Sequence, residues 1–198
     1  MSKTEEGQVG PEATDSRLHV ASPQAGKSES GLHRARRVEG RVFRLHLKPE
    51  TPGERGLPKS SMPAVRLRHS GLEGDFNRYR HEEKHDDEAM AVLIVPRETI
   101  EQLNREGWPV RPGDLAENIT SEGIAYDDFE VGRRFVVGRA RVVITKPCTP
   151  CTFLYLLPYV GEARGPDFLK TMVDRRGWYA RVEEEGDVRV GDSIRRSE

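Results

Sequence analysis

From residue 36 onward, the chain alternates short apolar segments with turns that contain glycine and proline, and this spacing limits the folds open to it. Most of these segments have the length of a β-strand. Strands are predicted over 39–47, 64–68, 90–95, 115–120, 129–131, 134–137, 140–145, 178–183 and 193–195. Because strands and helices do not alternate regularly, a doubly wound α/β sheet is not expected. We predict a mainly β fold, a β-barrel with a few peripheral helices.

Helices are expected at three places. The predicted strand at 90–95, MAVLIV, is apolar at every position, as in a strand buried on both faces. Pro96 follows this strand and suits the first turn of a helix, which is predicted over 97–106. Two later helices are predicted over 153–159 and 166–175.

The first 35 residues differ in composition from the rest of the chain. Ser, Thr, Glu, Gly and Pro dominate there, and the few apolar residues follow neither a helix nor a strand period. We predict a disordered tail over 1–35 and one domain over 36–198. The tail lacks the features of a secretory signal, and nowhere do about 18 apolar residues follow one another, as a membrane span requires. A soluble, cytoplasmic protein is expected.

The overall charge is close to neutral. The chain contains 32 Lys and Arg residues against 33 Asp and Glu residues, a formal charge of −1. A basic stripe, the usual mark of nucleic-acid binding, is therefore not expected, and neither is electrostatic attraction to a membrane surface. An anionic small molecule is not excluded, because a single cleft needs only one or two local cations.

The only cysteines lie in the segment Pro147-Cys148-Thr149-Pro150-Cys151. In a cytosolic protein, a structural disulfide between them is not expected. They precede a predicted helix, whose backbone N–H groups and dipole would stabilise a thiolate, the form that acts as nucleophile and metal ligand. Thioredoxin-like centres place such a motif after the first strand of a βαβ unit, whereas here it follows a series of strands. The alternative is that both cysteines are small apolar core residues.

A structural zinc site is a second alternative for these cysteines. Zinc would require two further ligands, and His81 and His85 are the only plausible pair. The surrounding segment 78–88, RYRHEEKHDDE, is so highly charged that a solvated, flexible loop is the stronger expectation.

Two further segments place a glycine beside an acidic residue. They are GLEGD at 71–75 and RPGDLAENIT at 111–120, the second followed by Glu122-Gly123. Glycine permits a positive φ angle or a close approach of the backbone to a ligand, although such pairs are usually simple turns. Asn118 and Thr120 are alternate residues of a predicted strand, so they share one face. Their neutral donors and acceptors suit a polar heterocycle.

Taken in order, these motifs resemble the MOSC domain, the molybdenum-cofactor sulfurase C-terminal type, over about residues 36–196. The order is GLEGD, His81 or His85 before MAVLIV, PGDLAENIT with Glu122-Gly123, Pro147-Cys148, Gly177-Trp178-Tyr179-Ala180-Arg181-Val182 and Gly191-Asp192. PGDLAENIT with the downstream cysteine is the most specific part. The resemblance implies a single-domain MOSC β-barrel that binds or handles the pterin-bound molybdenum cofactor or carries sulfur. Some members reduce N-hydroxylated bases and amidoximes.

The resemblance also implies roles for individual residues. Cys148 aligns with the characteristic cysteine of the family, the proposed molybdenum ligand or persulfide carrier, and a soft thiolate suits both roles. The cofactor-binding positions that it implies are Asp114, Glu117, Asn118, Thr120, Lys146, Arg181 and His85. Of these, Lys146 and Arg181 are the candidates for a cofactor phosphate.

Two departures from the family pattern bear on this site. Many members have His-Gly-Gly where this chain has His85-Asp86-Asp87, and two carboxylates would make binding of an anionic cofactor less favourable there. Cys151 is not part of the family pattern. As a second catalytic cysteine it would resolve a persulfide or sulfenate on Cys148, or it would be inert.

Three functions remain open at this stage. The first is a molybdenum-cofactor-dependent oxidoreductase with oxygen-atom or sulfur chemistry at Cys148, which receives electrons from a separate reductase because the chain has no flavin or nicotinamide fingerprint. The second is a metal-free sulfur carrier that receives persulfide sulfur on Cys148 from a cysteine desulfurase-type donor. The third is a non-catalytic binding or thiol-redox module. In the sulfurases, the MOSC domain is fused to a pyridoxal-phosphate domain; here that cofactor would belong to a partner.

Overall fold

The computed structural model describes residues 38–53 and 56–198. The predicted tail over 1–35 lies outside the described residues, so that prediction and the domain boundary at residue 36 stay predictions. In the described part of the chain, no helix is long and apolar enough to cross a membrane.

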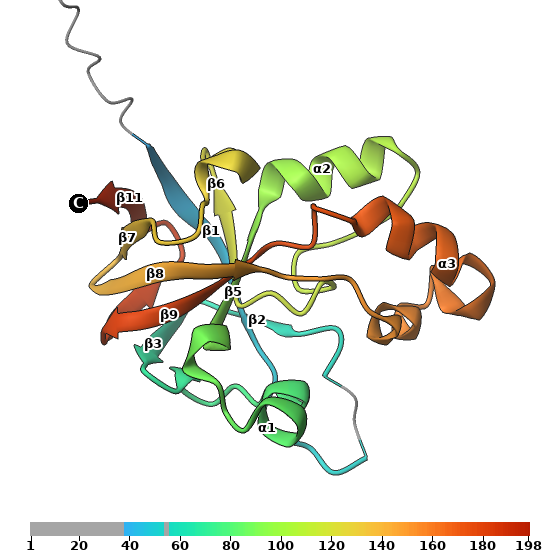
Figure 1. The fold of residues 1–198 in the computed structure, drawn as a ribbon, viewed down its shortest axis with the longest axis horizontal. Helices are drawn as coiled ribbons and strands as arrows, with labels where there is room; N and C mark the ends of the chain where they lie inside the picture. Colours follow the sequence, from blue (N-terminus) through green and yellow to red (C-terminus); the bar gives the residue numbers. More distant parts are fainter. Residues whose placement is uncertain (1–37, 54–55) are drawn as a thin grey trace, which may run out of the picture. The chain divides into compact units, whose positions relative to one another are not determined.

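Seven strands close into a barrel (Figure 1). Their order around the barrel is β11 (Ser193–Ser197), β7 (Arg134–Val137), β8 (Ala140–Pro147), β9 (Trp178–Glu184), β5 (Val92–Pro96), β6 (Ile119–Glu122) and β1 (Glu39–Leu47). β1 pairs back with β11, which closes the ring, and only β5 and β6 run parallel. The predicted mainly β fold, a barrel with peripheral helices, is confirmed.

Four short strands lie outside the closed ring or extend it. β2 (Ser60–Met62) pairs with β1, and β3 (Ala64–Arg68), β4 (Gly71–Leu72) and β10 (Gly186–Arg189) form a separate three-stranded sheet. The sequence predicted only β3 among them. The other three have two to four residues and follow no clear alternation, so they form only because tertiary contacts supply a pairing partner.

The strand β1 contains an irregularity that the apolar pattern reflects. Val42 and Leu45 are both buried in the barrel core although they are three positions apart, which strict alternation would place on opposite faces. The pairing of β1 with β6 shifts register between Val42 and Arg44. Such a bulge inserts one residue and restores the inward direction for the second half of the strand.

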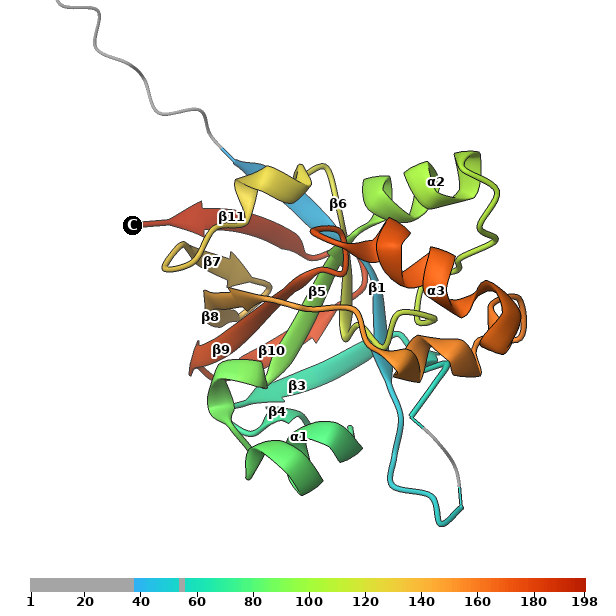
Figure 2. The same ribbon diagram turned by 45° about the vertical axis from the view of Figure 1, so that its right-hand side comes forward.

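Over residues 38–53 and 56–198, three α-helices lie around the barrel: α1 (Arg78–Lys84), α2 (Arg97–Arg105) and α3 (Gly161–Met172). α2 and α3 lie together on one side, whereas α1 lies beside β3 and β4 (Figure 2). The prediction for α2 is confirmed to within one residue. The other predicted helices are displaced: 153–159 contains only the 3-10 helix η3 (Thr152–Leu156), and the later helix begins at Gly161, five residues before the predicted start.

Three local predictions were wrong. Most of the segment 78–88 is not a loop: residues 78–84 form α1, which Asn77 caps by accepting a hydrogen bond from the Arg80 N–H. Residues 129–131 form a turn rather than a strand, and the strand predicted over 115–120 begins only at Ile119.

Strand β5 connects two hydrophobic cores. Val92 and Ile94 belong to the core inside the barrel, and Val95 belongs to a second core beneath α2 and α3 that includes Leu103 and Phe168. Successive strand residues point to opposite faces, so a strand buried on both faces must be apolar throughout. All five residues of β5 are buried, as the sequence predicted.

Candidate functional site

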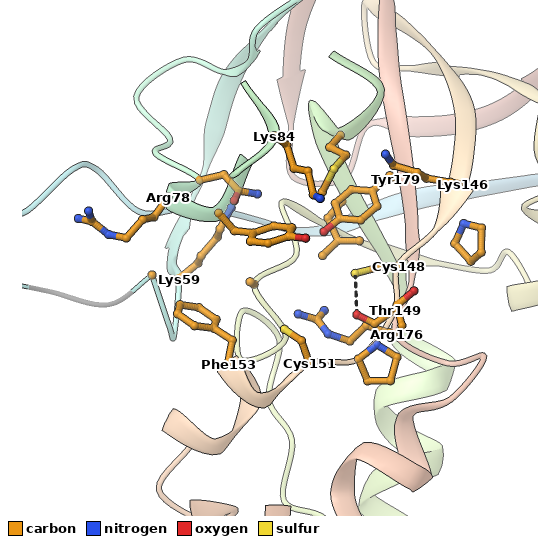
Figure 3. Close-up of a pocket in the computed structure, with 18 of the residues that line it drawn as sticks. Lys59, Arg78, Lys84, Lys146, Cys148, Thr149, Cys151, Phe153, Arg176 and Tyr179 are labelled. Atoms are coloured by element: carbon orange, nitrogen blue, oxygen red, sulfur yellow. Dashed lines mark hydrogen bonds between the residues drawn. The ribbon is translucent and has the colours of Figure 1, made fainter. Parts of the chain in front are cut away.

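A cavity of about 450 Å³ lies among α1, the end of β8 and the loop that follows β8 (Figure 3). This volume is within the range of small-molecule binding sites. Four aromatic side chains contribute to its wall, namely Phe76, Tyr79, Phe153 and Tyr179. Both cysteines of the chain also line it. The cavity therefore combines apolar ring surface with thiol chemistry.

The described wall of this cavity is positively charged. Five cationic side chains line it, Lys59, Arg78, Lys84, Lys146 and Arg176, and none of the described lining residues is Asp or Glu. Three of these cations have a carboxylate partner outside the lining; the pairs are Lys59–Asp75 at 2.6 Å, Lys146–Asp87 at 3.0 Å and Arg78–Glu82 at 2.6 Å. Lys84 and Arg176 have no carboxylate partner among the described residues. An anionic ligand would meet two cations that no described carboxylate neutralises.

Arg176 is the more constrained of these two cations. It is 4% exposed, its Nη1 donates a hydrogen bond to the Leu115 carbonyl, and its Nε has no partner among the described residues. Gly177 follows it with φ +104°, and a Cβ at that position would lie 2.6 Å from the Ile94 carbonyl oxygen. A buried guanidinium without a counter-charge is unfavourable, so its place on the cavity wall favours an anionic group beside it.

Cys148 is held by the backbone at the base of the cavity. It is 6% exposed, and its N–H donates a 2.8 Å hydrogen bond to the Gly177 carbonyl, which joins the end of β8 to the start of β9. Cys151 is exposed and directly precedes η3. Because η3 is a single 3-10 helix of five residues and shorter than the predicted helix, the cationic side chains contribute more to the electrostatics around the thiols than a helix dipole does.

Tyr179 lies beside the Cys148 sulfur. Burial raises the pKa of the Tyr179 phenol well above its usual value, and the Cys148 sulfur raises that pKa further. The phenol therefore keeps its proton at neutral pH. It is a hydrogen-bond donor next to the thiol that the sequence singled out.

The predicted ligands Glu117, Asn118 and Thr120 do not line the cavity but lie behind its wall. Glu117 is completely buried and accepts hydrogen bonds from the Gly113 N–H at 2.6 Å and the Thr120 hydroxyl at 2.9 Å. The Thr120 oxygen in turn lies 3.2 Å from His46 Nε2. Burial lowers the pKa of His46 and outweighs the opposing effect of Glu117. These contacts hold the PGDLAENIT segment in place.

Asn118 does not contact the cavity itself but is linked to its lining residue Lys59 through Asp75. Its Oδ1 accepts from the Leu93 N–H at 3.0 Å, and its Nδ2 donates at 2.8 Å to Asp75, the partner of Lys59. The polar face that we predicted for Asn118 is thus occupied by protein groups. Asn118 positions a cation of the cavity wall through Asp75.

The predicted ligand Asp114 also lies outside the lining. It accepts hydrogen bonds from the Tyr159 hydroxyl and the Arg111 N–H, each at 2.9 Å. Burial raises the pKa of Asp114 more than these hydrogen bonds lower it. From the PGDLAENIT segment, Ala116 is the lining residue, in the left-handed conformation at φ +59°.

Arg181 is exposed on β9 and is not a lining residue. Tyr179 and Arg181 lie on the same face of the strand, but Arg181 is two residues farther along, about 7 Å from the position that borders the cavity. On β9, the residue that lines the cavity is therefore Tyr179, and the predicted role of Arg181 stays a prediction. Lys146, the other predicted phosphate ligand, does line the cavity.

The residues at the end of α1 do not form a metal site. His85 is the helix C-cap with φ 48°, and His81 pairs with Asp86 at 2.9 Å. Among the described residues, no group of three or more His, Cys, Asp or Glu side chains could hold a metal ion, so the zinc alternative has no support. Asp87 pairs with Lys146, and the Ala89 N–H and Lys146 together lower the pKa of Asp87. Asp86 and Asp87, the two carboxylates expected to repel an anion, thus pair with His81 and Lys146.

Sequence reasoning missed four of the five lining cations, Lys59, Arg78, Lys84 and Arg176. Arg78 and Lys84 belong to α1, where the charged sequence predicts a loop; the capping residue Asn77 is the signal that indicates a helix. For Lys59 and Arg176 the sequence contains no comparable signal, because both are ordinary basic residues that become cavity residues only through burial.

Comparisons with known proteins agree with this architecture. The structure of the YuaD protein from Bacillus subtilis has a TM-score of 0.67 at 18% identity, over 82% of this chain and 98% of that chain. YiiM from Geobacillus stearothermophilus has a TM-score of 0.61 at 25% identity, over 80% and 75% of the two chains. YiiM from Escherichia coli has a TM-score of 0.57 at 21% identity, over 80% and 70%. A search of curated proteins finds no significant match.

The family model of the MOSC domain matches residues 81–195. The matched region extends from within α1 to β11 and includes three of the cavity's cations, Lys84, Lys146 and Arg176, and both cysteines. On this match, which covers more than half of the chain, and on the barrel just described, the protein belongs to the MOSC domain family.

Proposed function

We propose that the cavity binds the pterin-bound molybdenum cofactor, with Cys148 as a ligand of the metal, and that the protein is a molybdenum-dependent oxidoreductase. One observation carries the proposal: the family's characteristic cysteine lies on a cavity whose described wall contains five cations and no carboxylate. Membership in the MOSC family supports the same cofactor.

The chemistry of the wall fits such a group. A soft thiolate is a suitable ligand for a thiophilic metal. The partner-free Nε and buried charge of Arg176 suit a phosphate, which a guanidinium binds through two hydrogen bonds, and Lys84 adds a second cation. The aromatic rings of Tyr79 and Phe153 offer flat apolar surface to a planar heterocycle.

Each protein group would have a distinct task in this site. When bound, the molybdenum group supplies two-electron oxygen-atom or sulfur transfer. Arg176 and Lys84 bind the anionic end of the cofactor, and Asn118 and Asp75 hold Lys59 in the wall. Tyr179 keeps its proton and donates a hydrogen bond beside the Cys148 sulfur. Electrons come from a separate reductase.

Metal and pterin analysis of purified protein tests the proposal. After expression with added molybdate, the wild-type chain should contain molybdenum and pterin, and Cys148→Ser should lose the metal. Arg176→Gln should bind the cofactor about 10- to 150-fold more weakly, because a hydrogen bond to a charged group contributes about 1.5–3 kcal/mol. Arg181→Gln is the matched control, because Arg181 is exposed and outside the cavity, and it should bind cofactor like wild type.

Two results would reject this assignment. Equal cofactor loss in Arg176→Gln and Arg181→Gln would show that this cavity is not the binding site. Wild-type protein without molybdenum and pterin would reject the cofactor itself. If such protein gains about 32 Da on Cys148 from a cysteine desulfurase and cysteine, reversible by reductant, the sulfur-carrier function replaces the oxidoreductase.

A further inference from the structure

Cys148 and Cys151 differ sharply in accessibility although they line the same cavity. Cys148 is 6% exposed, whereas Cys151 is exposed. Only Thr149 and Pro150 separate them, and in Figure 3 both side chains lie at the same side of the cavity, with that of Arg176. One thiol can therefore be reached by reagents in solution while the other faces the site.

The Tyr179 phenol, which lines the same cavity, interacts with both thiols. Burial is the main cause that raises the pKa of the Tyr179 phenol; Cys148 raises it further, and Cys151 acts in the same direction. Arg176 opposes these effects. A single phenol thus interacts with both thiols, and the cation Arg176 lies within the same group.

The backbone between the two cysteines has freedom to bring the sulfurs together. It is anchored at its ends, where the Cys148 N–H donates to the Gly177 carbonyl and the Cys151 carbonyl accepts from the Leu154 N–H at 3.1 Å. Between these anchors, the Thr149 N–H and the Cys151 N–H make no backbone hydrogen bond within the described residues. Residues 148–151 form no regular turn in the structure; closure into a four-residue turn would bring the Cα atoms of the two cysteines within about 7 Å, close to the 4.4–6.8 Å range of disulfides.

We propose that Cys148 and Cys151 form a redox-active dithiol that a hydroperoxide converts into a disulfide. Cys151, the accessible thiol, reacts first and Cys148 resolves the product. A small-molecule or protein dithiol reverses the reaction by thiol–disulfide exchange.

Oxidation to the disulfide takes two steps. The Cys151 sulfur attacks one oxygen of the hydroperoxide, so that an S–O bond forms, the O–O bond breaks and an alcohol or water leaves. The Cys148 sulfur then attacks the Cys151 sulfur; the S–S bond forms, the S–O bond breaks and a water molecule leaves. The two thiols lose two electrons and the hydroperoxide gains them. Reduction returns two electrons from the dithiol, which becomes a disulfide itself.

Formation of the disulfide would affect metal binding at Cys148. This consequence rests on the proposed function. In the disulfide, the Cys148 sulfur is bonded to carbon and to sulfur and no longer has thiolate character. Oxidation would therefore remove the metal ligand without unfolding the barrel, because the anchoring hydrogen bonds lie outside the loop that moves.

Intact-mass measurement of the full chain tests the dithiol separately from the cofactor. Protein expressed without added molybdate is treated with hydrogen peroxide in slight excess. Wild type should lose about 2 Da, corresponding to two hydrogen atoms, and both free thiols, and dithiothreitol should restore them. A single proteolytic peptide should contain both cysteines in linked form. The molybdenum content of untreated protein expressed with molybdate tests the proposed cofactor, whereas the mass loss tests the dithiol. Each proposal can therefore fail without the other.

Two variants assign the order of reaction. Cys148→Ser should stop at a sulfenate on Cys151 that dimedone traps, and Cys151→Ser should show neither the mass loss nor rapid trapping, because its remaining thiol is buried. Thr149→Ser keeps both sulfurs and should behave like wild type. Disulfide-linked dimers in place of the internal bond would overturn the proposal. So would wild-type protein that gains about 16 Da per oxygen on Cys151 while Cys148 stays free.

Discussion

The ammonium group of Lys59 lies 2.6 Å from the Asp75 carboxylate, and the two side chains are 3% and 6% exposed. Burial lowers the pKa of Lys59, and Asp75 counteracts this effect. The pair is thus a buried ion pair on the wall of a cavity, and Asn118 supplies a further hydrogen bond to its carboxylate. Because Lys59 also lines the cavity, the same ion pair affects both the stability of the fold and the charge of the candidate site.

Asp75→Asn should destabilise the protein strongly. The substitution leaves the buried Lys59 without a counter-charge, and breaking a buried pair in this way costs about 3–5 kcal/mol. Urea unfolding followed by circular dichroism measures the free energy of unfolding. The control is Asp187→Asn, which removes the partner of Arg66 in a half-exposed pair and should cost less than about 1 kcal/mol. Similar losses for both variants would contradict a buried, charged Lys59.

His46 should make the stability depend on pH below neutrality. Its pKa is lowered in the folded state, chiefly by burial, and it interacts with Glu117, Lys59, Arg44 and Asp114. Between the lowered pKa and the ordinary value of 6.5, the unfolded state therefore binds more protons than the folded state. The free energy of unfolding should fall as the pH drops below 6.5, with a slope of at most about 1.4 kcal/mol per pH unit.

Urea midpoints measured between about pH 7.5 and 5.5 test this dependence. His46→Gln should flatten the slope, whereas the exposed His85→Gln should leave it as in wild type. Asp114, whose pKa is raised, contributes a pH dependence of stability with the opposite sign. Because both variants retain Asp114, it does not affect the comparison between them. An unchanged slope in His46→Gln would show that His46 takes up its proton equally in both states.

Asp87→Asn should strengthen anion binding in the cavity. It removes the carboxylate that pairs with Lys146 at 3.0 Å, while the asparagine oxygen can still accept the Ala89 N–H. Titration calorimetry with inorganic phosphate at low salt should show affinity about two- to fivefold higher than wild type, in keeping with a partly exposed pair. Arg176→Gln should weaken phosphate binding in the same assay. Loss of affinity in Asp87→Asn would mean that the pair itself holds the anion site together.

Gly177→Ala and Gly107→Ala separate steric conflict from backbone strain. Both glycines have a positive φ, +104° and +91°, but only a Cβ at Gly177 meets neighbouring atoms, the Ile94 carbonyl oxygen at 2.6 Å. Gly107→Ala should cost about 1 kcal/mol for the left-handed backbone. Gly177→Ala should cost about 2 kcal/mol more, because the loop anchor of Cys148 must shift as well. Thermal unfolding of the two variants measures the difference, and equal costs would argue against the close approach to β5.

Part of this protein was readable from its amino-acid order. The spacing of short apolar segments predicted the barrel strands, the apolar run before Pro96 predicted β5, and the PGDLAENIT segment with Cys148 indicated the MOSC family. These features are local, because alternation, turn residues and a short motif depend only on neighbours in the chain. The loop prediction over 78–88 failed because the capping residue Asn77 stabilises the helix α1 in spite of the high charge of the segment. The short strands β2, β4 and β10 were missed because they form only through their pairing partners.

Only the tertiary structure decided which residues surround the candidate site. Lys59 and Arg176 are more than a hundred positions apart, and burial on one wall, rather than any motif, makes them part of the same cavity. Arg181 and Asn118 matched the family pattern, yet strand position places the first too far along β9 and hydrogen bonding places the second behind the wall. A sequence states which charges exist; packing and register decide which of them face a ligand and which are neutralised by the protein itself.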